Sequence, residues 1–285
     1  MKKILFLSII LSCILNLLGE SNIDLANRYA YASNFGWIDW GMGTNQGATI
    51  GEYVCSGYIY SGNVGWINLG SGTPTNGIYY GNNSPGDFGV NNDGLGNLRG
   101  FAYGANIGWI NFESMGAPKV DLLSGRLSGF VWSCNCGWIS LSNAFAYVEV
   151  DSIQQGTLAP DGIPIAWLLS NFGTTNVNAN ADADGDGMSN LEEYLAGTDP
   201  NNANNNLRVI GFSCSSNGAN VSVEWTSVPT RSYHLQNLQS LNSADWSDSG
   251  LGVISSGGSS TSCSLAGTNA LMRYYRVQAF RPLMQ

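Results

Sequence analysis

The sequence predicts a mainly β protein in three parts: a repeated β-hairpin domain, a short helical linker and a C-terminal β-sandwich. Three observations support this prediction. A motif ending in Gly-Trp-Ile occurs four times in the first half, an Asp-rich loop between helix-like segments follows, and strand-like runs separated by turns fill the remainder. We place the boundaries at residues 1–21 for a leader, 22–155 for the repeats, 156–206 for the linker and 207–285 for the sandwich.

Composition narrows the classes of protein to which this chain can belong. Its 285 residues contain 20 Asp and Glu against 11 Lys and Arg, a net charge of −9, and only 11% of all residues are charged. The chain also contains 37 Gly, 13 Tyr and 9 Trp. Low charge with many glycines and aromatic rings favours β-structure with tight turns over a disordered polymer. A net acidic chain offers no basic surface to nucleic acid, so we expect no such partner.

Residues 1–21 have the pattern of a cleaved signal peptide. Two lysines begin it, a mostly apolar run extends from Ile4 to Leu18, and Gly19 and Ser21 supply the small residues that a signal peptidase requires. The apolar run is shorter than a membrane span. A membrane anchor and a lipid-modified Cys13 are the alternatives. We expect cleavage, no membrane insertion of the mature chain, and a secreted or cell-surface location.

Removal of this leader would leave five cysteines, so at least one thiol would be unpaired or would bridge two chains. Cys214 and Cys263 lie in the same C-terminal part and could pair in an oxidising compartment. Cys134 and Cys136 lack the spacing and the nearby histidine of a zinc site. The pairing therefore stays open, with buried free thiols as the alternative, for Cys55, Cys134, Cys136, Cys214 and Cys263.

Each copy of the repeat predicts a β-hairpin. Gly-aromatic-x-aromatic alternates as a strand does, Trp-Ile-x-apolar begins a second strand, and the intervening Asn-x-Gly tolerates positive φ. A further strand precedes copies two to four but not copy one, and residues 144–150 follow copy four at the matching distance. We expect these residues to pair near Tyr29–Ser33 and to close the repeats into a ring, barrel or propeller-like domain without exposed edges.

Six tryptophans in the repeats have two interpretations. Rings that recur in one frame can pack a core between repeats, or they can form an outward face that stacks on sugars. We expect a packed core, with carbohydrate binding as the alternative. The turn asparagines are expected to bond to backbone groups. The six tryptophans are Trp37, Trp40, Trp66, Trp109, Trp132 and Trp138.

The clearest chemical pattern is the loop from Asp182 to Glu193. Oxygen ligands at alternate positions, Gly187 for the sharp turn and an acid at the twelfth position are typical of a calcium loop, because Ca²⁺ binds several hard oxygen ligands. Ser189 and Glu192 predict a capping box that begins a short helix, which Gly197 ends. We expect Ca²⁺ as the cofactor, held by Asp182, Asp184, Asp186, the backbone carbonyl of Met188, Asn190 and Glu193.

Residues Asp182–Pro200, which end in Tyr-Leu-Ala-Gly-Thr-Asp-Pro, resemble the bacterial thrombospondin type 3 repeat. This is a calcium-binding relative of the EF-hand loop found in secreted and surface proteins. The preceding Asp161–Gly173 resembles the segment that often leads into it, and Pro164 is expected to begin a helix there that Gly173 ends. The resemblance implies metal binding without a biological role. The chain has one such loop, whereas a dockerin would carry two.

Five strand-like runs with turns between them predict a small β-sandwich of fibronectin-like type in the C-terminal part. They are Leu207–Cys214, Val221–Trp225, Tyr233–Leu238, Ser260–Leu265 and Arg273–Phe280.

We do not expect an enzyme. His234 is the single histidine, it lies on a predicted strand, and no Gly-x-Ser-x-Gly motif is present. The carboxylates of the repeats fall at different repeat positions and mark no glycosidase pair. We therefore expect a secreted or cell-surface, non-catalytic modular protein with structural calcium, acting in adhesion or as a scaffold, with an extracellular protein or polysaccharide as partner. The alternatives are a carbohydrate-binding surface protein and, with less support, a glycoside hydrolase.

Overall fold

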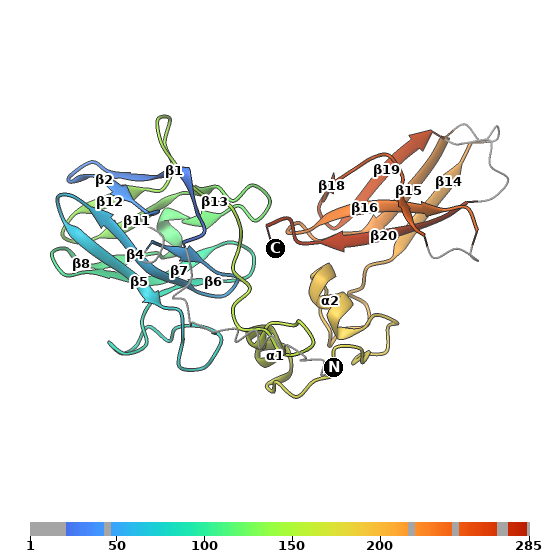
Figure 1. Cartoon of the computed structure of the whole chain (residues 1–285), viewed down its shortest axis with the longest axis horizontal. Coiled ribbons are helices and arrows are strands. Elements are labelled where there is room, and N and C mark those ends of the chain that lie inside the picture. Colours follow the sequence, from blue (N-terminus) through green and yellow to red (C-terminus); the bar gives the residue numbers. More distant parts are fainter. Residues whose placement is uncertain (1–20, 43–46, 216–219, 241–244, 267–272, 284–285) are drawn as a thin grey trace, which may run out of the picture.

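The computed structural model describes residues 21–42, 47–215, 220–240, 245–266 and 273–283. The chain forms a β-barrel, two short helices and two small antiparallel sheets in that order (Figure 1). The predicted leader, apart from Ser21, lies outside the described residues. Within the described ranges, no helix is long and apolar enough to cross a membrane.

The four repeats form a closed barrel of eight antiparallel strands, two from each copy. The strand order is β1-β2-β4-β5-β7-β8-β11-β12, and β12 pairs back onto β1 through Tyr31↔Ser140 and Ala32↔Ile139. The predicted hairpins and their closure are therefore confirmed. The strands are β1 (Ile23–Ala32), β2 (Gly36–Asp39), β4 (Cys55–Ser61), β5 (Gly65–Ser71), β7 (Leu98–Gly104), β8 (Gly108–Asn111), β11 (Phe130–Ser133) and β12 (Gly137–Ser140).

Short additional strands accompany each hairpin. The strand β13 pairs with β1, as β3 pairs with β4 and β6 pairs with β7. The chain after the fourth copy therefore supplies the additional strand of the first copy. Its partners are Ile23 and Arg28, not the expected Tyr29–Ser33, because that half of β1 already pairs with β12 and β2. The short strands are β3 (Thr49–Ile50), β6 (Val90–Asn92), β9 (Lys119–Val120), β10 (Leu127–Ser128) and β13 (Val148–Val150), with a 3-10 turn, η1, at Ser114–Gly116.

The Asn-x-Gly turns connect the two strands of each hairpin, and their asparagine side chains link neighbouring hairpins by hydrogen bonds. The turn glycines have φ between 71 and 86°, as the motif predicts. Each asparagine side-chain amide donates to the backbone carbonyl of a neighbouring turn, so the asparagines bond to backbone as expected. The four bonds form a circle: Asn63 to Phe35 (2.8 Å), Asn106 to Val64 (3.1 Å), Asn135 to Ile107 (3.1 Å) and Asn34 to Cys136 (2.9 Å).

The expectation that the repeat tryptophans pack in the core is wrong for five of the six. Trp40 is 1% exposed, but the other five are 40–51% exposed. The cause is the alternation of side chains along a strand. The isoleucine after each Gly-Trp points into the barrel, so the tryptophan before it points outward. Interiors of eight-stranded barrels are just wide enough to be filled by side chains. Those isoleucines, at most 2% exposed, are Ile38, Ile67, Ile110 and Ile139.

Cross-strand ring contacts hold the outward tryptophans in place. In every repeat the tryptophan lies edge-on or tilted against an aromatic ring of the preceding strand, with ring centroids 4.9–5.0 Å apart. Such pairs add about 0.5–1.5 kcal/mol beyond the area they bury. We refer to these rings as the aromatic belt; its pairs are Tyr31–Trp37, Tyr60–Trp66, Tyr103–Trp109 and Trp132–Trp138.

The two predicted helices begin and end at the residues that the sequence indicated. Helix α1 (Ile165–Phe172) begins after Pro164 and ends at Gly173, whose φ is 67°. Helix α2 (Asn190–Ala196) begins at Ser189, where the Ser189 N–H donates to Glu192 Oε2 at 2.8 Å and the Glu192 N–H donates to Ser189 Oγ at 3.4 Å.

The C-terminal part consists of two antiparallel sheets with a shared core that contains Trp225, Tyr233 and Leu235, each at most 1% exposed. All five predicted runs form strands, and two very short strands were not predicted. One sheet contains β14 (Val209–Cys214), β15 (Asn220–Thr226) and β19 (Ser260–Ala266); the other contains β16 (Ser232–Leu238), β17 (Ser247–Asp248), β18 (Ile254–Ser255) and β20 (Tyr274–Phe280).

A disulfide between Cys214 and Cys263 does not form. The two residues lie on β14 and β19, which flank β15 on opposite sides. Two strand spacings separate them by roughly 10 Å, beyond the reach of a disulfide. All five described cysteines are unpaired.

The circle of asparagine bonds predicts a measurable contribution to barrel stability. Asn106→Ala should lower the free energy of unfolding by about 1 kcal/mol, and replacement of Asn34, Asn63, Asn106 and Asn135 together by about 2–4 kcal/mol, because each change leaves a backbone carbonyl without its donor. Urea unfolding followed by tryptophan fluorescence measures both. Asn83→Ala, at an exposed asparagine, is the control and should stay within about 0.5 kcal/mol of wild type. A quadruple variant as stable as the control would contradict the prediction.

Candidate metal centre

The loop between the helices is curled around the carboxylate of Asp182. Its Oδ1 accepts the N–H groups of Gly185 (2.7 Å) and Asp186 (3.2 Å), and its Oδ2 accepts that of Gly187 (2.9 Å). Gly185 and Gly187 have φ values of 81 and 99°, a backbone conformation that favours glycine. This curl gathers the three aspartates that the spacing singled out. Ligand oxygens of Asp182, Asp184 and Asp186 lie within 4.8 Å of one another.

Helix α2 supplies Glu193, the acid at the twelfth position. Its side chain is fully buried, and neither carboxylate oxygen has a hydrogen-bond donor among the described residues. Burial, together with the charges of Asp184, Asp186 and Asp182, raises the pKa of Glu193 to about 7. A divalent cation bound between these carboxylates would offset their mutual repulsion.

Further buried oxygens in this region accept no hydrogen bond from the described part of the chain. They are Asp184 Oδ2, Asp186 Oδ2 and Asn190 Oδ1. The Asn190 amide nitrogen donates to the Asn178 carbonyl at 2.9 Å, which fixes the side chain and leaves its oxygen free. Buried polar atoms in proteins almost always have partners. A set of oxygen acceptors without proton donors matches the ligand preference of Ca²⁺.

Met188 links the loop to the C-terminal sheets. Its N–H donates to Asp186 Oδ1 at 2.8 Å, and its Sδ accepts the N–H of Leu207 at 3.2 Å. Its side chain packs against the core of the C-terminal sheets. The expected role of its carbonyl as a ligand stays a prediction, as does the complete ligand set.

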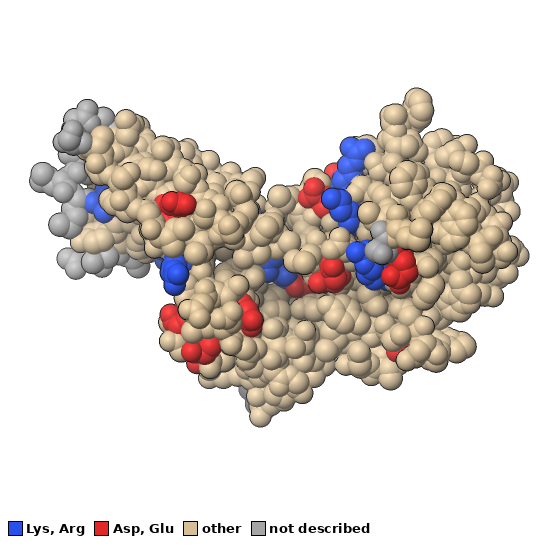
Figure 2. All heavy atoms as spheres, turned by 180° about the vertical axis from the view of Figure 1, so that it is seen from behind, with Lys and Arg blue, Asp and Glu red and all other residues tan. Residues whose placement is uncertain are grey.

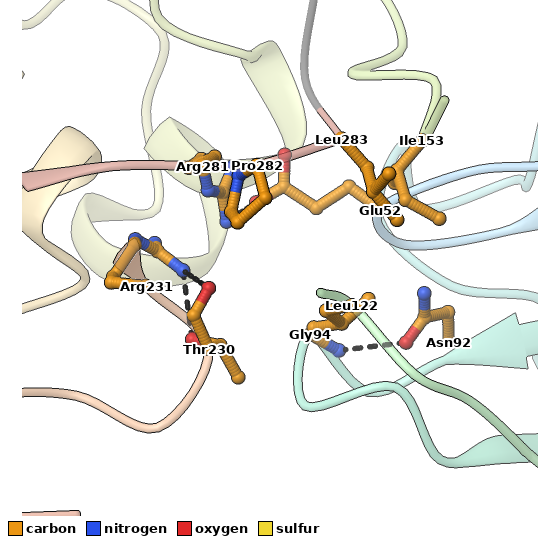
Figure 3. Close-up of a pocket in the computed structure, with 10 residues that line it drawn as sticks. All are labelled: Glu52, Asn92, Gly94, Leu122, Ile153, Thr230, Arg231, Arg281, Pro282 and Leu283. Atoms are coloured by element: carbon orange, nitrogen blue, oxygen red, sulfur yellow. Dashed lines mark hydrogen bonds and ion pairs between the residues drawn. The ribbon is translucent and has the colours of Figure 1, made fainter. Parts of the chain in front are cut away.

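The residue after Glu193 belongs to a buried polar junction that sequence reasoning missed. Glu52, in the barrel loop between β3 and β4, forms an ion pair with Arg281, which follows β20 (Figure 3). Tyr194 Oη donates to Glu52 Oε2 at 3.1 Å, and Arg281 Nη1 donates to Tyr194 Oη at 2.7 Å. Burial by itself would lower the pKa of Arg281, but the charge and hydrogen bond of Glu52 raise it above its usual value.

Arg231, in the turn between β15 and β16, binds the carboxyl end of α2. Its Nε donates to the Leu195 carbonyl at 2.8 Å and its Nη2 to the Tyr194 carbonyl at 3.1 Å. These carbonyls have no partner within the helix, and a cation near them is favourable. Burial and the nearby charge of Arg281 lower the pKa of Arg231, which is only 4% exposed.

The C-terminal tail returns to the barrel after β20 (Figure 1). The Ile153 N–H donates to the Leu283 carbonyl at 2.7 Å, and the Leu283 side chain packs against the barrel core. The barrel, α2 and the C-terminal sheets therefore meet at one place. No motif connects Glu52, Tyr194 and Arg281 along the sequence, so the fold alone reveals the junction.

Comparison with known families agrees with the geometry of the loop. Residues 182–203 match the family model described as Bacterial TSP3 repeat. Together with the aspartate cluster, the match identifies this segment as a bacterial TSP3 repeat, a calcium-binding repeat that usually occurs in extracellular proteins. No curated protein and no solved structure matches the chain.

Two neighbouring glutamates provide a test of the ligand set. Glu193→Gln should lower the affinity for Ca²⁺ at least tenfold, because it removes a charge from the cluster. Glu192→Gln is the matched control, since glutamine also serves in a capping box and the affinity should change less than about threefold. Calorimetric titration of metal-stripped protein measures both affinities. Equal affinities of the two variants would contradict the assignment of Glu193.

Proposed function

We propose that Ca²⁺ in the TSP3 repeat fixes the junction between the barrel and the C-terminal sheets, in a secreted or cell-surface protein that acts as a non-catalytic scaffold or adhesion module. One observation carries this proposal. Glu193, the acid at the twelfth position, is followed directly by Tyr194, whose hydroxyl lies between Glu52 of the barrel and Arg281 of the C-terminal part.

The path from the metal to the junction is short. Helix α2 has seven residues, and isolated helices of this length are marginal in water. Ligation at Glu193 would hold the first turn of α2 and so order the side chain of Tyr194 and the carbonyls that Arg231 binds. The loop also contacts the C-terminal sheets through Met188. Calcium binding therefore stabilises the arrangement in which the modules are docked.

An extracellular location suits this mechanism. The predicted leader and the usual occurrence of bacterial TSP3 repeats both support it. Extracellular calcium modules bind with dissociation constants of roughly 10⁻⁴–10⁻³ M, so a single structural site of this kind would be filled outside the cell. The partner we propose is an extracellular protein or polysaccharide.

The positions of the barrel carboxylates support a non-catalytic role. Asp39 pairs with Arg28 at 3.4 Å and Glu52 pairs with Arg281, so both are already neutralised. Four others accept backbone N–H groups, three in turns and loops and one in the irregular first part of β1, which is a structural use of an aspartate. These four are Asp24, Asp87, Asp93 and Asp121.

A second candidate function, carbohydrate binding, is favoured by the outward orientation of the aromatic belt. Tryptophan rings with 40–51% of their surface exposed are available to stack on sugars. Exposed aromatic surface of this extent on a soluble domain commonly marks an interaction site. Tryptophan fluorescence across a polysaccharide array distinguishes the two functions, since a pure scaffold would give no change with any polysaccharide.

Small-angle scattering tests the calcium-dependent junction. With millimolar Ca²⁺ the chain should be compact, and excess chelator should increase its maximum dimension and expose residues 174–206 to proteases, because α2 loses its anchor. Glu52→Gln should weaken docking even with calcium, since Arg281 would keep its charge without a partner. Glu113→Gln, at an exposed barrel carboxylate, is the control and should behave as wild type. Identical scattering with calcium and with chelator would reject the proposal.

A further inference from the structure

A hollow of about 520 Å³ lies on the outer surface of the barrel where the fourth repeat meets the first. We propose that this hollow binds an uncharged oligosaccharide or a segment of a neutral polysaccharide; the inference rests on carbohydrate binding, the second function proposed. The volume lies within the range of roughly 300–1,000 Å³ typical of ligand pockets. Its lining consists of Tyr31, Ser33, Phe130, Trp138, Ser140, Ser142, Asn143 and Phe145.

Four aromatic rings from three segments of the chain line the hollow. Tyr31 comes from β1, Phe130 and Trp138 from the last hairpin, and Phe145 from the loop before β13. Their exposures are 37, 48, 43 and 93%. Trp138 is held edge-on by Trp132 at 4.9 Å and by Phe130 at 6.3 Å between ring centroids. The Trp138 ring is therefore held in place yet open to solvent, as stacking on a sugar requires.

The loop that carries Phe145 is a structured turn. Asn143 Oδ1 accepts the N–H groups of Phe145 (2.8 Å) and Ala146 (3.0 Å), and the Asn143 N–H donates to the Ala146 carbonyl at 2.8 Å. A backbone turn held in this way loses little conformational freedom when a ligand binds, which favours affinity.

Polar groups with unused hydrogen-bonding capacity stand beside these rings. The hydroxyl of Ser33 and the amide nitrogen of Asn143 have no hydrogen-bond partner among the described residues. Ser140 and Ser142 are already engaged: Ser140 Oγ donates to the Ser142 carbonyl at 2.8 Å, and Ser142 Oγ accepts from Arg126 at 2.9 Å. Free hydroxyl and amide groups next to aromatic faces match a ligand with both C–H faces and hydroxyl groups.

The charge of the surroundings favours a neutral sugar. None of the residues that line the hollow is Asp, Glu, Lys or Arg. On the face of the molecule shown in Figure 2, many charged side chains lie between the barrel and the C-terminal sheets, and the part of the barrel farthest from that region shows few. An anionic polysaccharide or a nucleic acid would find no cluster of cations here. A lipid chain would leave the serine and asparagine groups without hydrogen bonds.

The proposal is tested by affinity electrophoresis and calorimetry of the full chain. The neutral polysaccharides are dextran, galactomannan, xylan and a mixed-linkage β-glucan, and alginate is the anionic comparison. At least one neutral polysaccharide should bind and alginate should not. Trp138→Ala should weaken binding at least tenfold and Phe145→Ala about three- to tenfold, because each removes a stacking ring. Trp66→Ala, at the same repeat position away from the hollow, and Leu95→Ala, on another exposed loop, are the matched controls and should change affinity less than twofold.

The possible outcomes separate the site from the function. No binding of any polysaccharide by wild type would overturn both. If binding survives Trp138→Ala and Phe145→Ala, or falls equally with Trp66→Ala, the hollow is not the binding site. Carbohydrate binding by the aromatic belt would then still be supported. Binding to alginate alone would overturn the neutral ligand. Thermal melting confirms that each variant is folded. If Trp138→Ala does not fold, Phe145→Ala tests the hollow by itself, since Phe145 is almost fully exposed and its loss should not affect folding.

Discussion

The pairing of β12 with β1 is the constraint on which both faces of the barrel depend. It closes eight strands into a cylinder, and the circle of asparagine amides closes with it through Asn34 and Cys136. A closed cylinder of this size is filled by the side chains that alternate inward along its strands, among them the four isoleucines, while the tryptophans that precede those isoleucines lie outside. Closure also removes the exposed edges on which a four-hairpin sheet would aggregate. The same pairing brings Tyr31 next to Trp138 and thereby creates the hollow.

Closure determines where the rest of the chain can attach. Glu52 projects from the loop between β3 and β4, and β13 delivers the chain to the linker beside the same region, since Glu52 N–H donates to the Gln154 carbonyl at 2.8 Å. Burial of the Glu52–Arg281 pair costs desolvation that its attraction only partly repays. Because a buried charge without its partner is strongly destabilising, the pair disfavours arrangements of the modules that separate Glu52 from Arg281. In the proposed function, calcium would stabilise the docked arrangement, because Glu193, the expected ligand, and Tyr194 are consecutive residues.

Local signals predicted local structure accurately. Proline, serine and glycine at the ends of α1 and α2 act within one helical turn, so Pro164, Ser189 and Gly197 could be identified from their neighbours. The aspartate spacing predicted the cluster of three carboxylates for the same reason. The orientation of the tryptophans could not be read in this way. Alternation shows that Trp and Ile lie on opposite faces, and only the width of the closed barrel decides which one faces inward. The junction residues are too far apart in sequence for any local signal.

The metal centre and the hollow are physically separate. The residues that line the hollow all belong to the barrel and its following loop, whereas the carboxylate cluster and α2 lie in the linker. In the proposed function, calcium bound in the linker would therefore act on the junction without altering the surface that would meet a sugar. The aspartate cluster lies in the linker, and none of the residues that line the hollow is charged. An uncharged, ring-lined hollow on the barrel and a separate TSP3 repeat in the linker fit the proposed module, which holds a partner at a fixed orientation.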